Sequence, residues 1–168
     1  AEANRILDHF NETLGTNVCY LMDVSGNTIA SSNRLAPDSF VGKNFAFRPY
    51  FQSALKGSPA IRMALGTASG KRGVYYGHPV YENEGVDPIG VVVIKAPIEP
   101  IEKELHQGQG DIVLLADPHG IVFISNRRDW IFHSLWKLSP EEEAEIQESR
   151  QFGGGPFLWT GLQTESKG

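Results

Sequence analysis

Residues 20–32 read YLMDVSGNTIASS, and residues 114–126 read LLADPHGIVFISN. Each stretch is an apolar run, a D-x-x-G turn and a second strand-like run, which predicts a hairpin. At an offset of 94 the two stretches share identical residues, namely Leu21 with Leu115, Asp23 with Asp117, Gly26 with Gly120 and Ser31 with Ser125. This internal repeat indicates two similar domains in tandem. Because D-x-x-G is also common turn chemistry, a chance match is the alternative.

The segments around the hairpins predict further helices and strands. Apolar residues at helical spacing open the chain, and Pro49 and Gly57 delimit a short helix after the first hairpin. Turn formers separate three expected strands, Ala60–Leu65, Gly73–Tyr81 and Ile89–Ala96. The remaining elements are a short helix in 97–107, a helix or strand in 128–138, a capped acidic helix in 139–150 and a terminal strand in 152–163.

These elements predict an α+β fold in which an N-terminal helix precedes two modules with antiparallel central sheets. We expect the helix in residues 1–16, the larger module in 17–106 and the smaller module in 107–168. The chain starts abruptly in helix-like sequence, so we expect it to be a fragment of a longer protein.

Composition and motifs exclude several classes of function. The chain has 168 residues, of which 40% are apolar and 21% charged, as in globular proteins. Its formal net charge of −5 argues against a nucleic-acid partner. The single cysteine, Cys19, allows no intrachain disulfide, and no His/Cys cluster predicts a metal. There is no phosphate loop and no nucleophile elbow, so we expect neither a cofactor nor a catalytic site in this chain.

Two cations lie in apolar stretches. Arg48 is inside FAFRPYF (residues 45–51), and Lys95 follows the apolar run IGVVVI (residues 89–94). If both face one partly dry pocket, they repel each other and lose hydration. A dianionic ligand resolves this conflict, because Arg48 can hold one carboxylate in a bidentate fork and Lys95 another as a point charge. Hydroxyls of Tyr50, Thr67 and Tyr76 can complete the hydrogen bonds.

Blander interpretations of both cations stay open at this point. Arg48 can pair with a distant acid such as Asp38, or stack on a tyrosine at the surface. Lys95 can extend from the strand end to water.

The sequence also resembles a known family. The stretches YLMDVSGNTIASSN, SFVGKNFAFRPYFQSALKG, GVYYGHPV and IGVVVIKAPIEPIE resemble, in order and spacing, the periplasmic sensor region of C4-dicarboxylate sensor histidine kinases. Residues 42–57 carry the pattern G-x-N-x-A-F-R-P-Y-F-x-x-A-x-x-G, which is quite specific to this group within the tandem PAS-like (double Cache) sensors. Residues 111–135 are similar to the membrane-proximal module of the same proteins.

This resemblance implies a function and a location. The larger, membrane-distal PAS-like module would bind succinate, fumarate or malate, and the smaller proximal module would usually be empty. Two transmembrane helices outside this chain would anchor a homodimer in the inner membrane, with the sensor region in the periplasm. A cytoplasmic kinase would follow, although related sensor modules also precede chemoreceptors and cyclases.

The resemblance also implies which residues bind the ligand. Arg48 would bind a carboxylate, and Tyr50, Lys95 and one strand tyrosine would complete the site. We prefer Tyr76 to Tyr75 for that position. The remaining ligand residues would be the loop hydroxyls, Thr67 and Ser69. One departure concerns Phe45, where many relatives carry a tyrosine, and it bears on ligand preference and affinity.

Two rival functions remain at this stage. The same module can bind a partner protein, in which case its cavity is purely structural, or it can bind a different small carboxylate. It can also act as an enzyme on a carboxylate, against which the missing base–nucleophile pair near Arg48 counts.

Overall fold

The computed structural model describes residues 2–83, 87–105 and 110–163. It divides into two compact units, Ala1–Pro97 and Ile98–Gly168. The expected module boundary between residues 106 and 107 lies outside the described residues.

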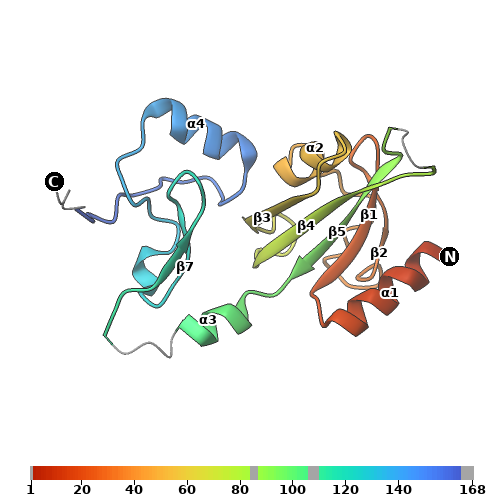
Figure 1. Cartoon of the computed structure of the whole chain (residues 1–168), viewed down its shortest axis with the longest axis horizontal. Helices are drawn as coiled ribbons and strands as arrows, with labels where there is room; N and C mark the ends of the chain where they lie inside the picture. The colour runs from red at the N-terminus through yellow and green to blue at the C-terminus, as the bar shows by residue number, and fades with distance from the viewer. Residues whose placement is uncertain (1, 84–86, 106–109, 164–168) are drawn as a thin grey trace. The chain divides into compact units, whose positions relative to one another are not determined.

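The first unit is built on a five-stranded antiparallel sheet with the strand order β2-β1-β5-β4-β3 (Figure 1). Its strands are β1 (Val18–Asp23), β2 (Thr28–Ser31), β3 (Ala60–Leu65), β4 (Arg72–Val80) and β5 (Gly90–Ala96). The three strands expected after the first hairpin are thus present within one residue of their expected bounds. β5 lies between β1 and β4, so the two halves of the unit meet at the strand that carries Lys95.

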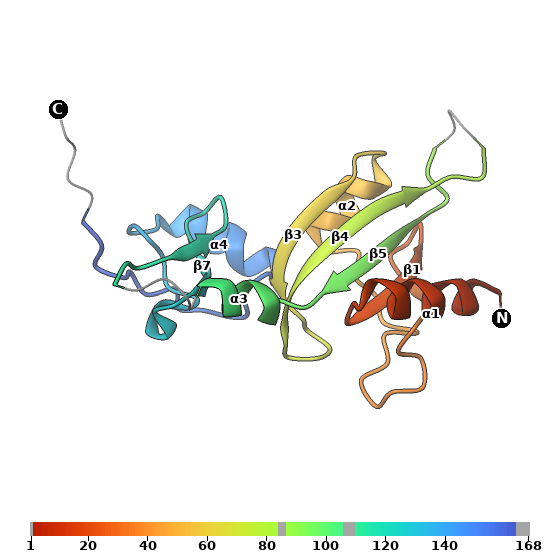
Figure 2. The same ribbon diagram turned by 60° about the horizontal axis from the view of Figure 1, so that its bottom comes forward.

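Two helices cover opposite faces of this sheet, as Figure 2 shows. Side chains alternate along β1, so that Tyr20 and Met22 pack against helix α2 (Pro49–Leu55) and Cys19 packs with Leu7 of helix α1 (Glu2–Leu14). The α2 face holds the main aromatic core of the unit.

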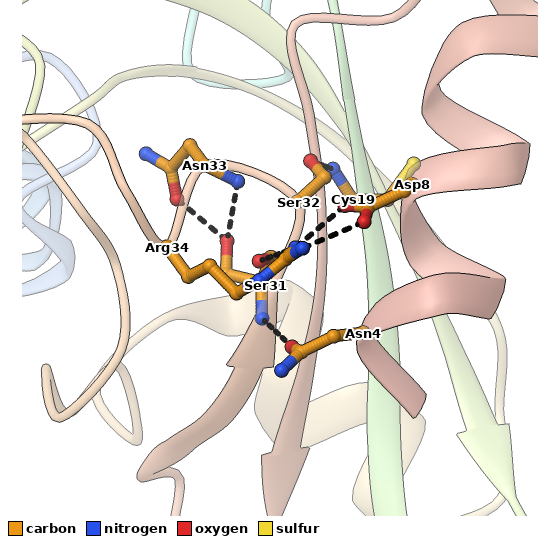
Figure 3. Close-up of polar contacts among 7 residues, drawn as sticks. All are labelled: Asn4, Asp8, Cys19, Ser31, Ser32, Asn33 and Arg34. Carbon is orange, nitrogen blue, oxygen red and sulfur yellow. Dashed lines mark hydrogen bonds and ion pairs between the residues drawn. The ribbon is translucent and has the colours of Figure 1, made fainter. Parts of the chain in front are cut away.

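Polar contacts fix α1 to the end of β2 (Figure 3). The guanidinium of Arg34 donates to both carboxylate oxygens of Asp8, at 2.6 and 2.8 Å. The amide N–H of Ser31 donates to the side-chain oxygen of Asn4 at 3.3 Å. These contacts join the N-terminal helix to the first unit in addition to the apolar contact of Leu7.

The described residues of the second unit form a two-stranded sheet and three short helical segments. Its elements are α3 (Glu99–Leu105), β6 (Leu114–Ala116), β7 (Val122–Ser125), the 3-10 helix η1 (Arg128–Trp130) and α4 (Pro140–Ser149). The expected helix or strand in 128–138 is wrong, because that segment forms the single turn η1 and isolated bridges at Ser134. The expected terminal strand is reduced to an isolated bridge between Trp159 and Ser134.

The two hairpins repeat in atomic detail, not only in sequence. Oδ1 of Asp23 accepts the amide N–H groups of residues 25 and 27, each at 2.9 Å. Oδ1 of Asp117 accepts those of residues 119 and 121, at 3.0 and 2.8 Å. Both hairpins carry a register irregularity between the two residues that precede the aspartate, and Gly26 and Gly120 have positive φ angles of 81° and 75°. The two turns thus share the same hydrogen bonds as well as the same sequence pattern, and the tandem repeat stays a prediction, because such aspartate turns are common.

Candidate ligand-binding site

A small cavity of about 10 Å³, roughly the space of one water molecule, lies between the sheet and α2 in the first unit. Residues from β1, α2, β4 and two connecting loops line it, namely Tyr20, Phe40, Phe45, Arg48, Tyr50, Gly66, Thr67, Ala68 and Tyr75. We call it the Arg48 cavity. Its wall is mostly aromatic, with one guanidinium and several hydroxyl groups.

Arg48 stands at the entrance of α2. Its extended backbone (φ −77°, ψ 129°) is the conformation that the following proline enforces, so Pro49 both starts the helix and orients Arg48. The side chain is only 2% exposed. Nη2 donates to the carbonyl oxygen of Leu65 at 2.8 Å, and the guanidinium carbon lies 5.2 Å from the centroid of the Phe47 ring. Arg48 is therefore a buried cation held at the start of the β3–β4 loop.

Lys95 is the second buried cation of the first unit, also 2% exposed. It lies on β5 opposite Tyr75, and Nζ is 5.5 Å from the centroid of that ring. Nζ donates to Oγ of Ser69 at 2.8 Å and to the carbonyl oxygen of Lys71 at 3.2 Å. Both cations thus hold the loop between β3 and β4, one at its beginning and the other at its end.

Glycine provides the space that Lys95 occupies. A Cβ atom on Gly66 would lie 2.5 Å from Oγ of Ser69, 2.9 Å from Oη of Tyr75 and 3.0 Å from Nζ of Lys95. A Cβ atom on Gly73 would lie 2.7 Å from Cε of Lys95. Any larger residue at either position would displace the ammonium group or its partners.

Three tyrosines supply hydroxyl groups. The hydroxyls of Tyr20 and Tyr50 are hydrogen-bonded at 2.8 Å, and the rings of Tyr50 and Tyr75 stack with centroids 5.2 Å apart at an angle of 5°. Burial raises the pKa of Tyr50 to about 12 and raises the pKa values of Tyr20 and Tyr75 well above the usual range. All three side chains therefore keep their protons at neutral pH and can donate hydrogen bonds.

The residues expected to bind ligand fall into three groups. Arg48, Tyr50 and Thr67 line the Arg48 cavity. Ser69 and Lys95 lie at its edge, bonded to each other, and do not line it. Tyr76 is 43% exposed on the opposite face of the sheet, where it lines an apolar groove with Ile61 and Val92.

The preference for Tyr76 over Tyr75 is not supported by this geometry. Adjacent strand residues point to opposite faces, so only one of the two tyrosines can face α2. The pairing of β4 with β5 puts Tyr75 opposite Lys95, and Tyr75 lines the cavity. Which face each tyrosine takes depends on this long-range register, which the local sequence does not contain.

Sequence reasoning also missed Tyr20 and Phe40. Tyr20 had a usable signal, because it alternates with Val18 and Met22 on the apolar face of β1 and a buried tyrosine needs a partner for its hydroxyl. Phe40 lies in the loop after β2, where no periodic pattern marks it as buried.

The described residues contain no group of three or more His, Cys, Asp or Glu side chains that could hold a metal ion. Within that same part of the chain, no helix has the length and apolar character needed to cross a membrane.

Comparisons with known proteins identify relatives over most of the chain. No protein-family model matches the sequence. The chain is 41% identical over 144 residues to the C4-dicarboxylate transport sensor protein DctB of Pseudomonas aeruginosa, which covers 86% of this chain and 23% of that protein. It is 36% identical over 155 residues to the protein of the same name from Rhizobium meliloti, covering 92% of this chain and 24% of that protein.

A solved structure agrees with these sequence relatives. The crystal structure of the sensor domain of the V. cholerae histidine kinase DctB matches with a TM-score of 0.88 at 38% identity, over 99% of this chain and 64% of that one. The chain spans about a quarter of the length of the curated relatives it matches. By this identity and this fold, the chain belongs to the C4-dicarboxylate transport sensor family, in which it corresponds to the periplasmic sensor domain.

Proposed function

We propose that the Arg48 cavity binds a C4-dicarboxylate such as succinate, fumarate or malate. The observation that carries this proposal is the placement of two buried cations, Arg48 and Lys95, at the two ends of the loop that forms one wall of the cavity. Carboxylates bound beside them would form charge-assisted hydrogen bonds, which are about twice as strong as neutral ones.

The two cations favour a diacid, because a ligand with a carboxylate at each end uses both at once. The cavity as described has a volume of only about 10 Å³, roughly the space of one water molecule, so its wall must open for such a ligand to enter. The aromatic wall would exclude water and so strengthen each polar contact.

Each residue has a separate role in this proposal. Arg48 holds one carboxylate, and the hydroxyls of Tyr50 and Thr67 donate to the same ligand. Lys95 holds the other carboxylate, which competes with Ser69 for the ammonium group. Tyr75 takes the place that the sequence assigned to Tyr76. Ser69 then contributes mainly by positioning Lys95.

The whole protein is part of the proposal. We infer that it is a membrane-anchored sensor histidine kinase that works as a homodimer. Binding in the periplasm would change kinase output only if the ligand has different affinities for the two signalling states.

Calorimetric titration of this chain with succinate, malate, malonate, acetate and an amino acid tests the proposal. We expect saturable binding of the C4 diacids and none of the amino acid. Absence of binding by every diacid would contradict the proposal and favour a partner protein as the signal.

Lys95→Ala tests the second carboxylate site. We expect this change to lower the affinity for succinate about 30- to 100-fold, the size of a lost bond to a charged group. The affinity for succinamic acid, which has an amide in place of one carboxylate, should fall much less. Lys71→Ala is the matched control, because the exposed Lys71 contributes its carbonyl oxygen, which the substitution keeps. Equal losses for both ligands would put Lys95 outside the site.

A further inference from the structure

A hydroxyl pair joins β1 to α2 in the wall of the Arg48 cavity. Oη of Tyr20 and Oη of Tyr50 are 2.8 Å apart, and the two side chains are 0% and 1% exposed. In the part of the chain that the structure describes, each hydroxyl has the other as its hydrogen-bond partner. Both residues line the cavity.

The protons of this pair can be counted. Two neutral phenols carry two protons, and a single hydrogen bond between them uses one. The other proton belongs to whichever hydroxyl accepts that bond. Since burial raises the pKa values of both groups, neither proton is lost at neutral pH. One donor of the pair is therefore available to a molecule in the cavity.

The surroundings determine which hydroxyl offers that donor. The ring of Tyr20 is enclosed by Phe40 and Phe45, with centroids 5.2 and 5.9 Å away. Tyr50 lies two residues after Arg48 at the start of α2. A carboxylate held by Arg48 is the strongest acceptor within reach, so the proton of Tyr50 goes to it. The oxygen of Tyr50 then accepts the proton of Tyr20.

We propose that Tyr20 is a positioning residue for the ligand: it donates its proton to Tyr50 and thereby directs the hydroxyl of Tyr50 at the bound carboxylate. This inference rests on the proposed dicarboxylate function of the Arg48 cavity. A chain of two hydrogen bonds that ends on a charged oxygen also polarises both members, which strengthens the terminal bond.

Tyr20→Phe, Tyr50→Phe and the double variant test this inference by titration with succinate. Tyr20→Phe removes one oxygen atom and keeps the ring against its two phenylalanine neighbours. We expect it to lower the affinity about three- to fivefold and Tyr50→Phe about tenfold. The double variant should lose no more than Tyr50→Phe alone, because Tyr20 acts through Tyr50.

Several outcomes would overturn this inference. If the unmodified chain binds succinate and Tyr20→Phe binds it as tightly, the relay is wrong and the proposed function stands. Losses that add in the double variant would mean that Tyr20 acts independently of Tyr50. If the unmodified chain binds no diacid, the proposed function fails and this inference fails with it. Tyr81→Phe, an exposed tyrosine at the end of the same sheet, is the control and should bind normally.

Proton NMR of the unmodified chain gives a second test, in which succinate is added to the protein without any substitution. Hydroxyl protons of buried tyrosines exchange slowly enough to be sought downfield. We expect succinate to shift the hydroxyl resonances of both Tyr20 and Tyr50. A shift confined to Tyr50 would contradict the relay.

Discussion

The α-helices that follow the two similar hairpins, α2 in the first unit and α4 in the second, begin in different ways. Both helices that follow have proline in the first turn, Pro49 in α2 and Pro140 in α4. In α4 the N-cap is Ser139, which forms a full capping box with Glu142 at 3.2 and 2.8 Å. In α2 the N-cap is Arg48, and its side chain forms no cap.

This difference shows that the first unit lacks a stabilising side-chain cap at the start of α2. Arginine is not among the residues favoured at an N-cap, and a serine there contributes about 0.5–2 kcal/mol relative to alanine. The first unit gives up that contribution and places a guanidinium in the Arg48 cavity instead. Local rules are broken at functional or strained sites, so the uncapped helix supports the role proposed for Arg48.

Among the variants that test this difference between α2 and α4, we expect Arg48→Ala and Arg48→Ser to have the largest effects. Both variants remove the guanidinium that would hold one carboxylate, so we expect each to lower the affinity for succinate at least about 100-fold. Arg48→Ser should also be more stable than Arg48→Ala, by about 0.5–2 kcal/mol, because serine can cap α2. Calorimetric titration and urea unfolding measure the two quantities.

Ser139→Ala is the matched change in the second unit. It should lower the free energy of unfolding by about 1 kcal/mol and leave the affinity for succinate unchanged. Equal stability of the two Arg48 variants would mean that a serine cannot cap α2, and the comparison would then fail. Succinate binding by Arg48→Ala at the original affinity would remove Arg48 from the site.

The two strand tyrosines give the next largest expected effect. Tyr75 lines the Arg48 cavity and Tyr76 lies on the opposite face. We therefore expect Tyr75→Phe to lower succinate affinity about three- to tenfold, the size of one ordinary hydrogen bond. Tyr76→Phe serves as the control within the same strand and should bind normally. The reverse ranking would restore the preference for Tyr76 that the sequence suggested.

Sequence patterns predicted what depends on near neighbours. The strand Ala60–Leu65 was predicted with its observed bounds, and the cap at Ser139 follows from spacing alone. Of the residues predicted to bind ligand, Arg48, Tyr50 and Thr67 line the Arg48 cavity, and their binding roles stay predictions.

The missed features depend on contacts between distant parts of the chain. The faces of Tyr75 and Tyr76 follow from the pairing of β4 with β5, and the burial of Phe40 follows from the fold of its loop. In residues 128–138 the backbone of Phe132 has a positive φ of 64°, which interrupts any regular element there. Phenylalanine carries no local signal for that conformation.

The two turn aspartates, Asp23 and Asp117, give the smallest expected effect, which is on how stability depends on pH. Hydrogen bonds from Asn27 hold the pKa of Asp23 below its usual value, whereas burial raises the pKa of Asp117. The carboxylate of Asp23 therefore contributes stability above the unfolded pKa of about 3.9, and this is lost as the pH falls through the folded pKa. Asp117 behaves oppositely, because its folded form takes up a proton first and so gains stability as the pH falls toward 3.9.

Asparagine variants separate these two contributions while keeping the side-chain oxygen that accepts the turn N–H groups. Between about pH 5 and 3, Asp23→Asn should make the loss of unfolding free energy shallower, and Asp117→Asn should make it steeper. Urea unfolding across this range measures both slopes. If both variants changed the slope in the same direction, burial of Asp117 would not be what distinguishes the two turns, and the second hairpin would be as open to water as the first.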